Sequence, residues 1–79
     1  MAIYTYDEEA DALYVLLLPE ADVAIERTVE LSDRLHVDLG VDGKPLGIEI
    51  LYPTNGAVDL GPLLERFGLD LHLPFNFAA

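Results

Sequence analysis

The segment Leu35–Leu51 constrains the fold of this chain more than any other, because it has the pattern of a β-hairpin. Asp42-Gly43 separates two runs of alternating apolar residues, and this dipeptide accepts the positive φ that a two-residue type I′ turn requires. A turn at this point matches apolar residues with apolar residues on one face. The predicted pairs are Leu39 with Leu46, Val37 with Ile48, and Leu35 with Ile50.

The other face of this predicted hairpin is polar. His36 falls opposite Glu49, and Asp38 falls opposite Gly47, where the missing side chain is expected to permit a close approach. Pro45 has no N–H to offer to an outer neighbour. The strand that follows Pro45 is therefore expected at a sheet edge, at least at its start.

Three further strands are predicted before the hairpin. Ala2–Tyr6 is short, β-branched and aromatic, and Asp7 can end it by accepting a hydrogen bond from the backbone two residues on. Ala12–Leu18 is apolar on both faces, which predicts burial from both sides, by the domain's own helix and by a second subunit. Val23–Leu31 alternates like a half-solvated antiparallel strand, and Ser32-Asp33 is the predicted turn into the hairpin.

One helix is predicted after the hairpin, beyond turn residues at Tyr52–Gly56. Asp59 is a plausible N-cap, and Pro62 is tolerated in the first turn. Gly68 supplies the stop. The apolar residues that follow helical spacing are Leu60, Leu63, Leu64 and Phe67.

The segment Leu69–Ala79 alternates apolar and polar residues and ends with Phe75 and Phe77. A free apolar tail brings no benefit to an acidic protein, so we expect it to dock on its own sheet or across a dimer interface. The sequence therefore predicts one α+β domain over residues 1–79, rich in β-structure. Residues 1–52 form a mainly antiparallel sheet of about five strands, and residues 53–79 form a packed helix and a docking tail.

Composition indicates how such a domain is stabilised. A chain of 79 residues buries only about 60% of its unfolded surface, and this one has no cysteine for disulfides or thiolate metal sites. Yet 52% of its residues are hydrophobic. Oligomerisation is the usual remaining route to burying them, so a homodimer is expected.

The charge limits the partners. Fifteen acidic residues against four basic ones give a formal charge of −11. Nucleic acids and anionic membranes both require basic residues, so neither is an expected partner. A basic protein is favoured electrostatically, although the charge also serves solubility. No positively charged segment leads an apolar stretch, and no apolar run could span a bilayer, so a cytoplasmic location is expected.

The densest polar cluster is Asp7, Glu8, Glu9 and Asp11. Hard cations bind several oxygens, but this spacing does not match a calcium loop, and no glycine permits its sharp turn. A solvated turn is the favoured interpretation, and no metal site is assigned.

His36 and Glu49 form the second candidate, because an imidazole oriented by a carboxylate can begin acid–base chemistry. The chain has no cysteine and no G-x-S-x-G motif, so a structural ion pair is favoured. No catalytic residue and no cofactor is assigned, and a non-enzymatic role is favoured. The candidate ligand-binding residues are Asp7, Asp11, Asp38 and Glu49.

Two motifs carry a family resemblance. They are Tyr6-Asp7-x-x-Ala10-Asp11-Ala12-Leu13-Tyr14-Val15 and Val37-Asp38-Leu39-x-x-Asp42-Gly43-Lys44-x-x-Gly47-Ile48-Glu49-Ile50-Leu51. Over residues 3–52 the chain resembles the bacterial and archaeal domain-of-unknown-function family 2283. The resemblance implies a compact β-rich domain without an established activity, and no catalytic residue is carried over. Relatives often have Asp-Gly where this chain has Asp33-Arg34.

Two functions remain open at this stage. The first is a homodimeric protein–protein interaction module. Some relatives resemble partners of toxin–antitoxin neighbours, which implies an antitoxin-like role with a basic protein. The alternative is a small-molecule or divalent-metal binding protein that uses the carboxylates of the 7–11 turn and of the hairpin face. This alternative requires those carboxylates to converge, which raises some of their pKa values by like-charge repulsion.

Overall fold

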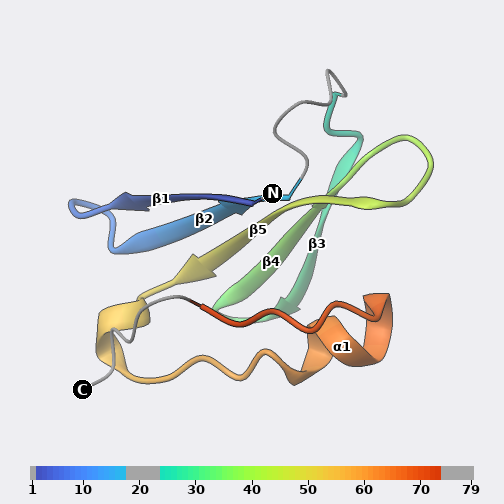
Figure 1. Cartoon of the computed structure of the whole chain (residues 1–79). Helices are drawn as coiled ribbons and strands as arrows, with labels where there is room; N and C mark the ends of the chain where they lie inside the picture. Colours follow the sequence, from blue (N-terminus) through green and yellow to red (C-terminus); the bar gives the residue numbers. More distant parts are fainter. Residues whose placement is uncertain (1, 18–23, 74–79) are drawn as a thin grey trace.

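A computed structural model describes residues 2–17 and 24–73 of the chain (Figure 1). Its strands form one antiparallel sheet in the order β1-β2-β5-β4-β3, and the described residues contain one α-helix near the C-terminal end. The predicted β-rich α+β fold is therefore confirmed. The elements are β1 (Ile3–Asp7), β2 (Ala12–Leu16), β3 (Arg27–Ser32), β4 (Leu35–Leu39), β5 (Pro45–Leu51), the 3₁₀-helix η1 (Pro53–Asn55) and α1 (Gly61–Phe67).

The molecule has two layers. Helix α1 and the segments on either side of it run along one face of the sheet, which we call the core face (Figure 1). The other face, the open face, is covered by no helix or strand of the described residues. Alternation along the paired strands places Tyr14, Thr28, His36, Asp38, Gly47 and Glu49 on it. The fully or almost fully buried apolar residues are Leu13, Val15, Leu35, Val37, Leu39, Ile48, Ile50 and Leu63.

The central hairpin has the predicted register at its base and a different turn at its tip. The pairs Leu35–Ile50, His36–Glu49, Val37–Ile48 and Asp38–Gly47 all form. The loop is three residues long, because Gly40 N donates to Lys44 O at 2.9 Å and Gly43 N donates to Gly40 O at 3.0 Å. Only Gly43 in this loop has positive φ, at 80°. This is a type I turn closed by a left-handed glycine, so the predicted type I′ turn was wrong.

One extra residue in β5 compensates for the longer loop. Leu39 pairs with Pro45 instead of the predicted Leu46, and the register shifts between Leu39 and Asp38. Leu46 is the extra residue, and this bulge returns the later pairs to the register that keeps apolar side chains on the core face.

The expected edge position of the strand after Pro45 is wrong for the strand beyond its start. β5 is the central strand of the sheet and pairs with both β2 and β4. Its pairing with β2 runs from Gly47 onward, and Pro45 precedes it. Proline is tolerated here because it lies next to the bulge.

Strand β1 and its turn form as expected, whereas β2 and β3 differ from the prediction. Leu13 and Val15 are fully buried, but Tyr14 and Leu16 on the open face are only half-buried. The predicted burial is therefore present on the core face, and the predicted cover of the other face by a second subunit stays a prediction. The ends of these segments, Leu18 and Val23, lie outside the described residues. β3 starts only at Arg27, and the turn after it is Asp33-Arg34, one residue later than predicted.

Helix α1 forms almost as predicted. Leu60 is its N-cap in place of Asp59, although Asp59 Oδ1 accepts a hydrogen bond from Gly61 N at 2.9 Å. Gly68 ends the helix with φ 67°. Leu63 is completely buried, whereas Leu64 is 54% exposed, so the predicted apolar stripe was wrong at Leu64.

The docking of the tail on its own sheet is confirmed for residues 69–73. Leu69, Leu71 and Leu73 pack against the apolar core. Phe75 and Phe77, which belong to the same prediction, lie outside the described residues.

Arg34 holds the connection through which the chain leaves the sheet for the covering layer. Its Nε donates to Leu51 O at 3.0 Å, and its guanidinium also donates to the carbonyl oxygens of Tyr52 and Gly56. Tyr52 adopts left-handed φ at this point.

In the described part of the chain, no helix has the length and apolar character that crossing a bilayer requires.

Candidate functional site

Three side chains from three strands meet on the open face. The hydroxyl of Tyr14, from β2, donates to Asp38 Oδ2 at 2.7 Å. The hydroxyl of Thr28, from β3, donates to Asp38 Oδ1 at 2.5 Å. Each oxygen of the Asp38 carboxylate therefore accepts a hydrogen bond, and the carboxylate links the strands on both sides of the central hairpin.

The phenol reaches Asp38 because Gly47 lies between them. β5 separates β2 from β4, so the Tyr14 side chain must cross it. A Cβ at position 47 would lie 1.9 Å from Tyr14 Oη and 2.4 Å from its Cζ. The close approach predicted at Gly47 is thus confirmed, and the group that approaches is the Tyr14 ring.

The environment keeps Tyr14 protonated. Burial, and after it the hydrogen bond to Asp38, raises the pKa of Tyr14 above its ordinary value, and the charges of Asp38 and Glu49 act in the same direction. Tyr14 is therefore a hydrogen-bond donor at neutral pH. A role as a base or nucleophile would require the opposite shift.

The predicted contact between His36 and Glu49 is present next to this group. His36 Nδ1 lies 3.3 Å from Glu49 Oε1, and the side chains are 24% and 43% exposed. The pair links β4 to β5 on the open face. No second group that could complete a nucleophilic site touches it among the described contacts.

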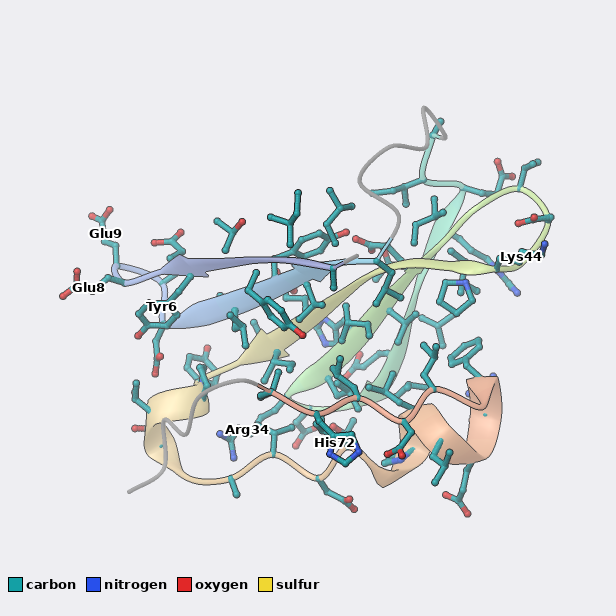
Figure 2. The ribbon with its side chains drawn as sticks, viewed as in Figure 1. Tyr6, Glu8, Glu9, Arg34, Lys44 and His72 are labelled. Atoms are coloured by element: carbon teal, nitrogen blue, oxygen red, sulfur yellow. The ribbon has the colours of Figure 1, made fainter. Side chains whose placement is uncertain are left out.

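The other two candidate residues, Asp7 and Asp11, lie in the turn between β1 and β2. Asp7 Oδ1 accepts hydrogen bonds from Glu9 N at 3.1 Å and Ala10 N at 3.2 Å, as the sequence predicted for a tight turn. Figure 2 shows Glu8 and Glu9 pointing away from the body of the molecule.

The Asp11 carboxylate accepts hydrogen bonds from two different segments of the chain. Its carboxylate accepts hydrogen bonds from Thr54 Oγ1 at 2.5 Å and from Tyr6 Oη at 2.8 Å. The Thr54 hydroxyl, with support from Tyr6, lowers the pKa of Asp11 below its ordinary value, and the same Asp11 carboxylate raises the pKa of Tyr6. Asp11 O also accepts from Tyr52 N at 2.8 Å, so the turn is tied to the connection after β5.

The structure therefore brings the candidate residues together as two pairs. Asp38 and Glu49 lie on the open face, whereas Asp7 and Asp11 lie in the turn. In residues 2–17 and 24–73, no three His, Asp or Glu side chains gather as metal ligands do. The lowered pKa of Asp11 is also opposite to what repulsion among converging carboxylates would produce.

Sequence reasoning missed the contacts that Tyr14 and Thr28 make with Asp38 on the open face. The predicted strand that contains Tyr14 is apolar on both faces, so its local pattern did not indicate that the hydroxyl meets a carboxylate. Its hydroxyl meets Asp38 only because β2 joins the hairpin on the β5 side, a pairing between distant segments. Gly47 opposite Asp38 was the available signal that a large side chain approaches there.

A family model described as "Protein of unknown function (DUF2283)" matches residues 3–52. The match includes strands β1 to β5 of the described residues and the candidate residues on both the open face and the turn. It ends before Thr54 and the layer that covers the core face. No curated protein and no solved structure matches the chain.

Proposed function

The chain belongs to the DUF2283 family, whose description gives no function, and we propose that this member is an acidic protein–protein interaction module. In this proposal it acts in the cytoplasm as a homodimer and binds a basic protein, in the manner of an antitoxin that binds its toxin. Nucleic acids and membranes are not among its partners, because the chain lacks the basic surface that they require.

The open face is the observation that carries the proposal. Carboxylates from three strands lie on it, namely Asp38, Glu49 and Glu30, around the half-buried ring of Tyr14. A polar rim around a partly apolar centre, presented on a rigid sheet, is typical of surfaces that bind other proteins.

The four Lys and Arg residues lie away from the open face, which leaves this face acidic. Arg34 donates to backbone carbonyls, Lys44 lies 4.0 Å from Asp42 at the hairpin tip, and Arg66 lies over the Phe67 ring. Arg27 pairs with Leu39 and so belongs to the core-face side of β3. Since these are the four Lys and Arg residues of the chain, the described part of the open face carries neither lysine nor arginine.

The homodimer is supported by apolar side chains on the surface. In a chain with 52% hydrophobic residues, several large ones remain substantially exposed in the described part. They are Ile3, Tyr6, Ile25, Val41, Tyr52 and Leu64. A second copy would bury some of this surface, and light scattering on the full chain measures whether it does. A mass equal to that of one chain at micromolar concentration contradicts this part of the proposal.

Affinity capture from the native host, followed by a binding measurement on the purified partner, tests the interaction. We compare the wild type with a Glu30→Gln/Glu49→Gln variant and with a Glu65→Gln/Asp70→Asn control, which removes the same charge away from the open face. We expect a basic protein that the wild type and the control retain and the open-face variant loses, with binding that weakens as salt increases. Equal binding to all three chains, or an acidic partner, contradicts the proposal.

The alternative, a small-molecule or divalent-cation site at Asp7, Asp11, Asp38 and Glu49, has less support from the geometry. Asp11 and Asp38 already accept two hydroxyl hydrogen bonds each. Titration of the protein with Ca²⁺ and Mg²⁺ by calorimetry tests it directly. Saturable binding that Asp38→Asn or Asp11→Asn abolishes would favour this alternative over the interaction module.

A further inference from the structure

Strand β3 forms one edge of the sheet, and the hydrogen bonding identifies which backbone groups lie along that edge. Leu51 N donates to Arg34 O at 2.9 Å, so Arg34 bonds toward β5. Because successive residues of an antiparallel strand bond to opposite sides, Val37 bonds toward β3 and meets Val29 there. By the same alternation, the N–H and C=O groups of Thr28 and Glu30 point outward.

The side chains along this edge divide by face. Thr28 and Glu30 are exposed on the open-face side, and Glu26 and Asp33 flank the strand. On the core-face side, Val29 and Leu31 are half-buried and pack against the apolar core. A strand added here would therefore meet acidic and polar groups on one side and the margin of the core on the other.

A second copy of this chain is a poor occupant of the edge. Antiparallel pairing of two β3 strands about Val29 places each Glu30 opposite Thr28 and brings the two Glu30 carboxylates into diagonal contact. Pairing about Thr28 places Glu26 directly opposite Glu30. Like charges across a strand pair are destabilising, so the acidic residues that prevent self-pairing favour a basic strand instead.

We infer that the β3 edge accepts an extended basic segment of the partner protein as a sixth strand of the sheet. Lysine or arginine at alternate positions would lie on the open-face side beside Glu30, and apolar residues between them would contact the margin of the core at Val29 and Leu31. Main-chain hydrogen bonds to Thr28 and Glu30 provide the docking, and the alternation provides the specificity. This inference rests on the proposed function, because it names the surface and the form of the basic partner.

The probe for this inference is a synthetic peptide of alternating lysine and valine, with a block-ordered peptide of the same composition as its control. Calorimetry measures affinity, and amide hydrogen exchange by NMR locates the bound peptide. We expect protection of the Thr28 and Glu30 amides and weaker binding of the block-ordered peptide. Equal affinity for both peptides, or protection confined to other strands, would overturn the inference.

Two variants at Glu30 separate backbone from charge by their difference, because Glu30→Pro removes the carboxylate together with the N–H, whereas Glu30→Gln removes the charge alone. Glu30→Pro removes an outward N–H without removing a bond to β4, and we expect affinity to fall about tenfold or more. Glu30→Gln is expected to weaken binding about threefold, while Glu65→Gln, with the same change of charge on α1, leaves it unchanged. Wild-type affinity in Glu30→Pro rejects the edge site, and if Glu30→Pro fails to fold, the exchange data on the wild type decide. A host partner captured through the open face would uphold the proposed function even when this edge is rejected.

Discussion

The two faces of the sheet are built on different principles, although they share the same strands. The core face consists of aliphatic side chains that are fully or almost fully buried beneath α1 and the tail. The open face has a hydrogen-bonded group, Tyr14–Asp38–Thr28, whose members come from three strands. The core face is stabilised by many packing contacts that add up, whereas the open-face group depends on one glycine and two hydroxyls. In the function that we propose, the core face maintains the fold and the open face binds the partner.

Truncating Leu63 is expected to have the largest effect. Its side chain is completely buried between α1 and the sheet, so Leu63→Ala leaves a cavity and should lower the free energy of unfolding by about 3 kcal/mol. Leu64→Ala is the matched control on the same helix, since Leu64 is 54% exposed, and should cost less than about 0.5 kcal/mol. Urea denaturation measures both. Equal losses in the free energy of unfolding would contradict the difference in burial between Leu63 and Leu64.

Gly47→Ala should cause the next largest loss and tests how tightly the open face is packed. The new Cβ would meet the Tyr14 hydroxyl and ring, and the displaced ring would give up its bond to Asp38, so we expect a loss of about 2 kcal/mol. In a Tyr14→Ala background the same substitution should cost less, because the three atoms nearest to the new Cβ all belong to the Tyr14 hydroxyl and ring. A double-mutant cycle by urea denaturation measures the coupling, and additive effects would show that the ring does not oppose the methyl group.

The difference between the core face and the open face also explains how much of the fold could be predicted from the sequence. The register of β4 with β5 followed from alternation alone, because a shift by one residue would move Val37 and Ile48 off the core face. The turn did not follow, since Asp42-Gly43 fits both a two-residue turn and the end of a three-residue loop. The bulge at Leu46 makes both turns compatible with one register.

The candidate site was less predictable than the core. Asp38 and Glu49 were assigned to one hairpin face correctly, because they pair within neighbouring strands. The contacts of Tyr14 with Asp38 and of Thr54 with Asp11 join segments that no local pattern relates. The exposure of Leu64 likewise depends on how α1 is oriented on the sheet, which helical spacing alone does not define.

Tyr14→Phe removes a single hydroxyl from the open face and should cost about 1 kcal/mol near neutral pH, the scale of one hydrogen bond to a carboxylate in a half-buried position. Because the pKa of Tyr14 is raised in the folded state, the phenol stabilises the fold below its ordinary pKa of about 10 and loses this contribution as pH rises above that value. The difference in the free energy of unfolding between wild type and Tyr14→Phe should therefore become smaller at alkaline pH. Urea denaturation across this pH range measures it, with the half-exposed Tyr52→Phe as the control. If this difference does not change with pH, Tyr14 does not stabilise the fold as a protonated hydrogen-bond donor.

Thr54→Val should have the smallest effect on the free energy of unfolding. It tests whether the Asp11 carboxylate, at the end of the sheet, depends on a hydroxyl hydrogen bond as the Asp38 carboxylate on the open face does. Thr54 lies outside the family match, yet its hydroxyl is the main reason that the pKa of Asp11 is lowered. A lowered pKa stabilises the fold above the ordinary aspartate value of about 3.9, and this contribution is lost as pH falls through the folded pKa. Removing the Thr54 hydroxyl should raise the pKa of Asp11 toward that value, while Tyr6 still donates a hydrogen bond to Asp11.

NMR titration of the Asp11 carboxyl measures the change, and Thr5→Val serves as the control. An unchanged pKa would mean that Tyr6, the Thr54 backbone and Arg34 lower the pKa of Asp11 sufficiently without the Thr54 hydroxyl.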